Sequence, residues 1–271
     1  MMGQFYPEDL QKGSVKMTGN VLLLASAKGG VGKSTVALGV SRALVERGKR
    51  VLLVDLDFHN PCLDLLCGVE NQGLYTLADA AAGTCQPMDA CLRPDPGKEL
   101  YLLPAGTPEG ALCAESAKDV IKAVAEATDA AYILMDTGAG KTVGLEVGAA
   151  LAKTALIVAG HSPTSIRAAE RTGAALFAWN IPDVRMVINS FDPEGAQGQR
   201  SSMLQIADGA HLPLSGVIPY DYCLLLAGEG CGSAQNAAAA FQNIADRLLG
   251  KNVPLFHGIP KLRRQRKRLF R

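Results

Sequence analysis

The fold is decided by one stretch, Ala27-Lys28-Gly29-Gly30-Val31-Gly32-Lys33-Ser34-Thr35. It follows the apolar run Val21–Ser26 and opens an apolar pattern of helical period, Lys33–Arg47. A glycine-rich loop between a strand and a helix is the context that a phosphate-binding loop requires. Glycines let the backbone wrap closely around phosphate oxygens, while successive N–H groups and the positive end of the helix face the anion. The stretch therefore predicts a phosphate loop.

Two side chains of this loop carry chemistry of their own. Lys33 can reach the outer phosphates as a point charge, and the Ser34 hydroxyl can bind Mg²⁺, which keeps other positions for phosphate and water. The first glycine of the common G-x-x-x-x-G-K-[ST] pattern is replaced by Ala27. The residues expected to bind the nucleotide phosphates are Gly29, Gly30, Val31, Gly32, Lys33, Ser34 and Thr35.

Short apolar runs rich in Val, Ile and Leu alternate with longer helical patterns along the chain, which is typical of βαβ units. Several runs are apolar almost throughout, as strands buried on both faces are. Strands are expected at Val21–Ser26, Val51–Asp55, Tyr101–Pro104, Tyr132–Asp136, Ala155–Gly160, Arg185–Ser190 and Gly216–Tyr220. Helices are expected at Lys33–Arg47, Glu115–Thr128, Val143–Ala152, Ser165–Trp179 and Ser233–Leu249. The pattern predicts an α/β fold of the phosphate-loop NTPase type, with a mainly parallel twisted sheet of about seven to eight strands.

Composition divides the chain into a large acidic body and a short basic end. Residues 261–271 hold seven of the chain's 27 Lys and Arg residues and no acidic one, so that the rest is net acidic. We predict a polar extension over 1–19, a phosphate-loop ATPase domain over 20–250, a linker with two prolines over 251–260, and a basic tail over 261–271.

Several classes of protein are disfavoured at this level. No run approaches 18 apolar residues, and the polar start of the chain has no apolar secretory core, so neither a spanning helix nor a signal peptide is expected. Aromatic residues make up 5%, too few for a base-stacking sheet. The seven cysteines include no C-x-x-C pair, which favours inert thiols over zinc or disulfides.

The segment Lys28–Ser34 resembles the deviant phosphate loop of the MinD/ParA ATPases, a family in which the position of Ala27 is variable. The early lysine, Lys28, is the signature of that family. The resemblance implies that Lys28 crosses the interface of an ATP-dependent homodimer and touches the partner's phosphates. One cation per protomer would offset the repulsion between two nucleotides that face each other.

The same resemblance implies ATP or ADP with Mg²⁺ as cofactors and assigns three carboxylates. Asp57 is expected near the attacking water and Asp55 near Mg²⁺, while Asp136 would hold the metal through water as a Walker-B aspartate does. Gly138 and Gly140 would let the following loop reshape when the γ-phosphate leaves. The expected catalytic residues are Lys28, Lys33, Asp57 and Asp136, and the expected metal ligands are Ser34, Asp55 and Asp136.

The resemblance also implies an adenine site, formed by residues at or just after the ends of two expected strands. Asn189 occupies the family's adenine-reading position, and its amide can both donate and accept hydrogen bonds. Pro219 and Asp221 follow the last expected strand and resemble the other wall of the base site.

Four segments resemble the MinD branch of the family, whose members regulate the cell-division site: Asp57–Leu65; Gly68–Glu70 with Tyr75 and Tyr101–Ala105; Asn243–Leu255; and Ile259–Arg271. This implies a slow ATPase, stimulated by membrane and partner, that recruits a division inhibitor. Partners of the MinC and MinE type are expected, and sequence-specific nucleic acid is not.

The tail resembles the membrane-targeting sequence of that branch. On a helix, Leu262 and Leu269 share one face, with Phe270 at its edge. Each basic residue near an anionic leaflet contributes about 1 kcal/mol, and two tails on a dimer bind far better than one. We expect a cytoplasmic protein that is peripheral on the inner face of the cell membrane, through Leu262, Arg263, Arg264, Arg266, Lys267, Arg268, Leu269 and Phe270.

Some residues depart from the MinD pattern and leave other functions open. The loop Asp136–Gly140 is closer to the flagellar regulator FlhG, while Lys141 and Ala168 stand where acidic residues are usual on the partner-binding face. A ParA-like DNA-partition ATPase is a further alternative, which the acidic body disfavours. A metal-insertion or nitrogenase-iron-protein-like ATPase would need a cysteine just past Asp136. A scaffold without activity is disfavoured by the intact lysines and aspartates.

Overall fold

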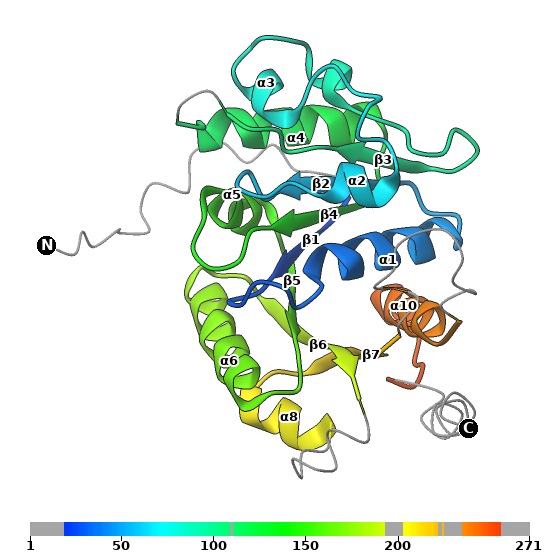
Figure 1. Ribbon diagram of the computed structural model, residues 1–271, viewed down its shortest axis with the longest axis vertical. Coiled ribbons are helices and arrows are strands. Elements are labelled where there is room, and N and C mark those ends of the chain that lie inside the picture. The colour runs from blue at the N-terminus through cyan, green and yellow to red at the C-terminus, as the bar shows by residue number, and fades with distance from the viewer. Residues whose placement is uncertain (1–18, 109–110, 193–202, 222–223, 225–234, 256–271) are drawn as a thin grey trace, which may run out of the picture.

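Strand β1 (Asn20–Ala25) lies in the middle of a seven-stranded parallel sheet whose order is β3-β2-β4-β1-β5-β6-β7 (Figure 1). The computed structural model describes residues 19–108, 111–192, 203–221, 224 and 235–255. The other strands are β2 (Val51–Leu56), β3 (Leu100–Leu103), β4 (Tyr132–Thr137), β5 (Thr154–Ala159), β6 (Asp183–Phe191) and β7 (Leu214–Pro219). The predicted fold class is confirmed.

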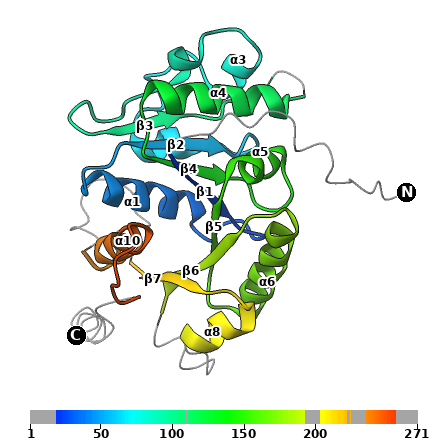
Figure 2. The same cartoon turned by 180° about the vertical axis from the view of Figure 1, so that it is seen from behind.

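Helices cover both faces of this sheet (Figures 1 and 2). One face carries α1 (Lys33–Val45), α2 (Leu63–Cys67) and α10 (Gln235–Leu248). The opposite face carries α3 (Leu77–Ala81), the 3₁₀ helix η2 (Pro87–Ala90), α4 (Ala114–Ala127), α5 (Val143–Leu151), α6 (Pro163–Ala178) and α8 (Met203–Ala210). A doubly covered sheet explains why its strands are apolar along nearly their whole length.

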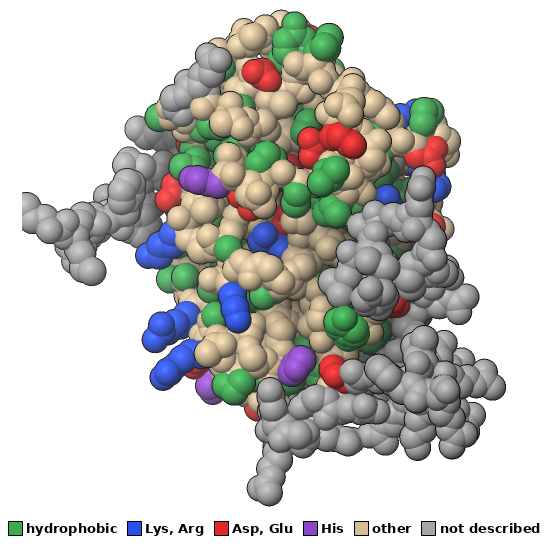
Figure 3. All heavy atoms as spheres, viewed as in Figure 1, with side chains coloured by type: hydrophobic (Ala, Val, Ile, Leu, Met, Phe, Trp, Pro, Cys, Tyr) green, Lys and Arg blue, Asp and Glu red, His purple; other side chains and the backbone are tan. Residues whose placement is uncertain are grey.

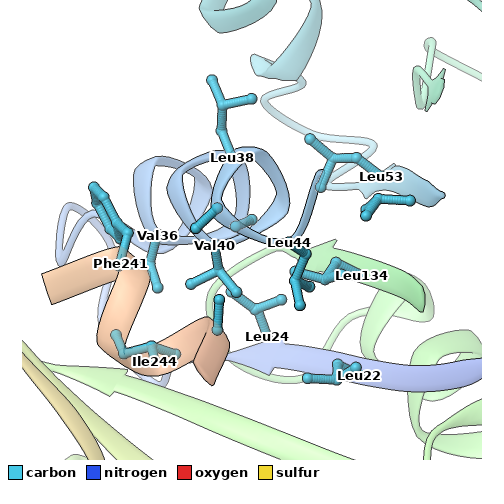
Figure 4. Close-up of a cluster of buried hydrophobic side chains, with 14 of the residues drawn as sticks. Leu22, Leu24, Val36, Leu38, Val40, Leu44, Leu53, Leu134, Phe241 and Ile244 are labelled. Carbon is cyan, nitrogen blue, oxygen red and sulfur yellow. The ribbon is translucent and has the colours of Figure 1, made fainter. Parts of the chain in front are cut away.

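Alternation along β1 shows how the two layers are built. Leu22 and Leu24 point to α1 and α10, while Leu23 and Ala25 point to the opposite layer. Figure 4 shows Phe241 of α10 beside Val36 of α1, and Ile244 of α10 belongs to the same buried cluster as the β1 leucines. This packing fixes the start of α1, and therefore the phosphate loop, against the carboxyl edge of the sheet.

Every predicted strand and helix is present, with ends that differ by at most two residues among the residues that the structure describes. The start of the last predicted helix at Ser233 lies outside the described residues. Sequence reasoning missed α2, α3, η2 and α8 because short helices show too little periodicity. A capping box marks the start of α3, where Thr76 and Asp79 bond each other's backbone N–H groups.

The segment after α10 returns to the edge of the sheet. The Val217 N–H donates to the Leu255 carbonyl at 3.4 Å, and Arg247 Nη1 donates to the Val253 carbonyl at 2.7 Å. The first part of the predicted linker therefore packs on the domain. The rest of the linker, the tail over 261–271 with all its membrane residues, and most of the N-terminal extension lie outside the described residues. The predicted domain boundaries stay predictions.

Candidate functional site

The phosphate loop joins β1 to α1 through two glycines in the left-handed region. Gly30 has φ 73° and Gly32 has φ 81°, and Gly32 is the N-cap of α1. The N-cap glycine has no side chain to cap this helix, so within the described residues its first N–H groups are available for an anion. Lys33 is buried, whereas Ser34 and Thr35 on the first turn are half-buried and Gly29 and Gly30 are exposed. The loop has the form that phosphate binding requires.

Lys33 faces the buried carboxylate of Asp136 at the end of β4. The distance from Lys33 Nζ to Asp136 Oδ1 is 3.4 Å, and Asp136 is fully buried. Neither oxygen of Asp136 accepts a hydrogen bond of ordinary geometry within the described part of the chain. Burial raises the pKa of Asp136, and the nearby Lys33 and Ser34 side chains oppose that rise.

These neighbours fit a hydrated Mg²⁺ ion. A buried carboxylate beside a serine hydroxyl offers the hard oxygen ligands that Mg²⁺ prefers. The residues that the structure describes contain no cluster of three His, Cys, Asp or Glu side chains placed to hold a metal. Mg²⁺ is commonly held by one or two carboxylates together with substrate phosphates and water, which is the set that Ser34 and Asp136 leave room for.

Asp55 lies directly beside Asp136 on the neighbouring strand, since the two residues are paired in the ladder of β2 and β4. Its carboxylate accepts hydrogen bonds from the N–H groups of Asp57 at 2.9 Å, Cys62 at 3.0 Å and Leu63 at 3.1 Å. Burial raises the pKa of Asp55 to about 6, and these hydrogen bonds oppose the rise. The predicted role of Asp55 as a metal ligand stays a prediction.

Asp57 and the loop after β4 lie against each other. A Cβ atom on Gly138 would lie 3.1 Å from Asp57 Oδ1, which shows how closely the loop passes the carboxylate. The Gly140 N–H donates to the Ser26 carbonyl at 3.0 Å, and Ser26 Oγ donates to the Lys28 carbonyl at 3.1 Å. Ser26 thus links the phosphate loop to the predicted switch loop, a role that sequence reasoning missed.

Lys28 is exposed, and the described residues give it no ion pair. Its side chain is therefore available to a partner outside its own chain. The structure brings its loop together with Lys33, Asp57 and Asp136 at one edge of the sheet. These are the four residues predicted to act in catalysis.

Asn189 contacts the phosphate loop itself. Its Nδ2 donates to the Val31 carbonyl at 2.7 Å, and a Cβ atom on Gly32 would lie 2.3 Å from that nitrogen. The ladder between β6 and β7 is irregular here, and the adjacent Ser190 has φ 53°. Such a bulge re-aims side chains, and it could not be read from the sequence.

Pro219 and Asp221 lie at the same carboxyl edge of the sheet. Pro219 pairs with Phe191 of β6, and the Tyr220 N–H donates to the Phe191 carbonyl at 3.0 Å. The structure therefore places both residues beside the end of β6. Their contact with a base stays a prediction.

The family relationship follows from this arrangement and from the sequence match that covers it. The CobQ/CobB/MinD/ParA nucleotide binding domain matches residues 22–229. The chain belongs to this family. The matched range contains the phosphate loop, the three carboxylates and Asn189, whose individual roles in the site stay predictions.

MinD proteins are similar to the chain over most of its length. Septum site-determining protein MinD of Synechocystis sp. is 33% identical over 243 residues, which are 86% of this chain and 91% of that protein. The structure of the MinC:MinD cell division protein complex of Aquifex aeolicus matches with a TM-score of 0.78 and 27% identity, over 88% of this chain and 99% of that one.

A more distant match supports the fold. MinD of Pyrococcus horikoshii, in a complex with Mg-ADP, has a TM-score of 0.71 and 23% identity, over 87% of this chain and all of that one. The chain is thus a nucleotide-binding ATPase of the MinD type within the MinD/ParA family. No helix in the described ranges is long and apolar enough to cross a bilayer.

Proposed function

We propose that this protein is a membrane-cycling ATPase, dimeric when it binds ATP, that positions or regulates the division septum by recruiting a division inhibitor. The observation that carries the proposal is the site at the carboxyl edge of the sheet. There an exposed Lys28 stands on the same loop as a buried Lys33, whose Nζ lies 3.4 Å from the buried carboxylate of Asp136.

ATP would bind with its phosphates on the N-terminal turn of α1. Lys33 would contact the outer phosphates, while Ser34 and Asp136 would hold Mg²⁺. The metal would neutralise the charge that develops on the transferred phosphate oxygens. Asp57 would accept a hydrogen bond from the attacking water, because its carboxylate faces the loop that carries Gly138.

Two copies would face each other across their nucleotides. Lys28 of each copy would contact the phosphates held by the other, so that the charge repulsion between two triphosphates becomes an attraction through two cations. Loss of the γ-phosphate would release the loop that contains Gly140, whose N–H bond to Ser26 connects it to the Lys28 carbonyl. Hydrolysis would therefore separate the copies.

The basic tail would hold the dimer on the inner face of the cell membrane. One tail would bind weakly and reversibly, and two would bind far better because the second binds at high effective concentration. The chain approaches the tail from the edge of β7, where Leu255 contacts Val217.

The division inhibitor would be a partner of the MinC type, since the Aquifex relative is found in a complex with MinC. Arg167 and Arg171 are exposed on α6, and Figure 3 shows basic side chains along the side of the molecule where α5 and α6 lie. Lys141 and Ala168 on this side differ from the acidic residues usual in the family. The loop Asp136–Gly140 is closer to that of FlhG, which keeps an FlhG-like role in flagellar placement as the second candidate.

Binding to anionic vesicles tests the membrane part of the proposal. Full-length protein should sediment with phosphatidylglycerol-containing vesicles in the presence of Mg-ATP and remain in the supernatant with Mg-ADP. A variant that lacks residues 261–271 should stay in the supernatant with either nucleotide. Equal sedimentation of the truncated and full-length proteins with ATP would contradict the membrane role of the tail.

A further inference from the structure

Two buried carboxylates lie side by side at this edge of the sheet, and they differ in how many hydrogen bonds they accept. Asp55 and Asp136 are direct neighbours in the ladder of β2 and β4, and both are at most 1% exposed. Asp136 has no hydrogen bond of ordinary geometry in the described chain, whereas Asp55 accepts three from backbone N–H groups. A carboxylate offers about four acceptor positions, so most of those on Asp55 are used.

The three donors come from the two ends of one loop. Oδ1 of Asp55 accepts from the Asp57 N–H, and Oδ2 accepts from the N–H groups of Cys62 and Leu63. Cys62 is the N-cap of α2 but provides no side-chain cap. The carboxylate of Asp55 therefore satisfies N–H groups at the start of α2 that would otherwise lack an acceptor.

This arrangement closes the chain from Asp57 to Leu63 into a loop around one carboxylate. Asp57 is further fixed because its Oδ1 accepts from the Asn60 N–H at 3.2 Å. The resulting position of Asp57 is the one that places its carboxylate against Gly138. The orientation of the residue expected to handle water thus depends on its neighbour two positions earlier.

We propose that Asp55 is a positioning residue, which acts on hydrolysis by holding the loop that carries Asp57, and that the metal is held by Asp136 and Ser34. The inference rests on the proposed ATPase site. It differs from the sequence prediction, which placed Asp55 near Mg²⁺. The two roles give different kinetic results, because loss of a metal ligand raises the Mg²⁺ requirement and loss of a loop anchor does not.

An Asp55→Asn substitution separates the roles. Asparagine has one acceptor end and one donor end, while both ends of Asp55 face backbone N–H groups. In either orientation, the new NH₂ group meets at least one backbone donor. The loop loses one or two of its three anchors, although the size of the side chain hardly changes.

The experiment compares full-length wild type, Asp55→Asn and Asp136→Asn. For each we would measure kcat, the KM for ATP, the half-saturating Mg²⁺ concentration, and the hydrogen exchange of the Asp57, Cys62 and Leu63 amides. For Asp55→Asn we expect kcat to fall about 100-fold, as for a misplaced catalytic group, with KM and the Mg²⁺ requirement within about twofold of wild type. Exchange at the three amides should become faster.

Asp136→Asn is the matched control, because it changes the neighbouring carboxylate, which has no such bonds. It should raise the half-saturating Mg²⁺ concentration by about 10-fold or more and leave exchange at the three amides as in wild type. If Asp55→Asn raises the Mg²⁺ requirement as much as Asp136→Asn does, Asp55 is a metal ligand and the inference is wrong. An unchanged kcat in Asp55→Asn would overturn it as well.

Amide exchange keeps the inference testable without ATPase activity. If wild type does not hydrolyse ATP, the proposed function fails, while faster exchange in Asp55→Asn would still show that Asp55 holds the loop, and unchanged exchange would refute it. If Asp55→Asn does not fold, Asp55→Ser removes the carboxylate without adding a buried NH₂ group. The same readouts and outcomes apply to that variant.

Discussion

The Lys33 ammonium nitrogen lies 3.4 Å from Oδ1 of Asp136, and neither oxygen of that buried carboxylate accepts a hydrogen bond of ordinary geometry in the described chain. Leaving a buried charged group without hydrogen bonds is unfavourable. The burial of Asp136 is explained if a bound metal and nucleotide provide hydrogen-bond donors to its carboxylate. A water molecule bound to Mg²⁺ would donate a hydrogen bond to Asp136, and Lys33 would turn to the phosphates.

Replacing Lys33 with alanine should weaken nucleotide binding. Loss of the charge-assisted bonds to phosphate should reduce ATP affinity by about 10–100-fold, as measured with a fluorescent ATP analogue. Saturating Mg-ATP should raise the melting temperature of the wild type and, at the same concentration, that of Lys33→Ala much less. Lys153→Ala changes an exposed lysine before β5 and should behave as wild type. Equal affinity of Lys33→Ala and wild type would refute the assignment.

A side chain at Gly144 should destabilise the fold. A Cβ atom there would lie 2.0 Å from the carbonyl oxygen of Leu56, which is backbone and cannot rotate away. We expect Gly144→Ala to push α5 from the end of β2 and to lower the free energy of unfolding by about 1–3 kcal/mol in urea denaturation. At Gly160 the nearest atom would be 3.8 Å away, so Gly160→Ala should change stability little. Similar stability of the two variants would contradict this packing.

Asp246 joins α10 to α1. Its two oxygens accept from Arg47 Nε and Nη2, both at 2.6 Å, and this pairing holds the pKa of Asp246 well below its usual range. Asp246→Asn should therefore lower the free energy of unfolding by about 1 kcal/mol at pH 7. Because the pKa is lower in the folded state, this stabilisation is complete above about pH 4 and is lost as the pH falls towards the folded-state value.

Urea denaturation of wild type and Asp246→Asn at pH 7 and at about pH 2.5 measures this difference. The difference in free energy of unfolding between the two proteins should be smaller at the lower pH. Asp119→Asn removes an exposed carboxylate that pairs with Lys122 at 3.2 Å on α4, and it should have little effect at either pH. If the difference in free energy of unfolding between wild type and Asp246→Asn grows as the pH falls, the ionised form of Asp246 does not stabilise the fold as proposed.

The sheet, its main helices and the phosphate loop could be predicted from the sequence because they depend on apolar periodicity and glycine spacing within short stretches of chain. The sequence could not reveal that Asn189 contacts Val31, since that contact depends on a bulge in β6. Nor could it show that Asp55 accepts three backbone hydrogen bonds while Asp136 has none of ordinary geometry in the described chain, because the path of the loop from Asp57 to Leu63 is not visible in the sequence pattern. The expectation that the cysteines are inert stays a prediction. Cys113 is exposed at the start of α4, and hydrogen bonding with Ser116 lowers the pKa of its thiol.

The proposed membrane cycle depends most on the ATP-dependent pairing of two chains through Lys28, and light scattering after gel filtration measures this pairing directly. With a non-hydrolysable ATP analogue and Mg²⁺, the wild type should have about twice the 28.4 kDa mass of one chain, and with ADP it should have that mass once. Lys28→Ala should remain a single chain with the analogue, whereas Asp57→Ala should still pair. Single chains for the wild type with the analogue, or full pairing of Lys28→Ala, would contradict the account.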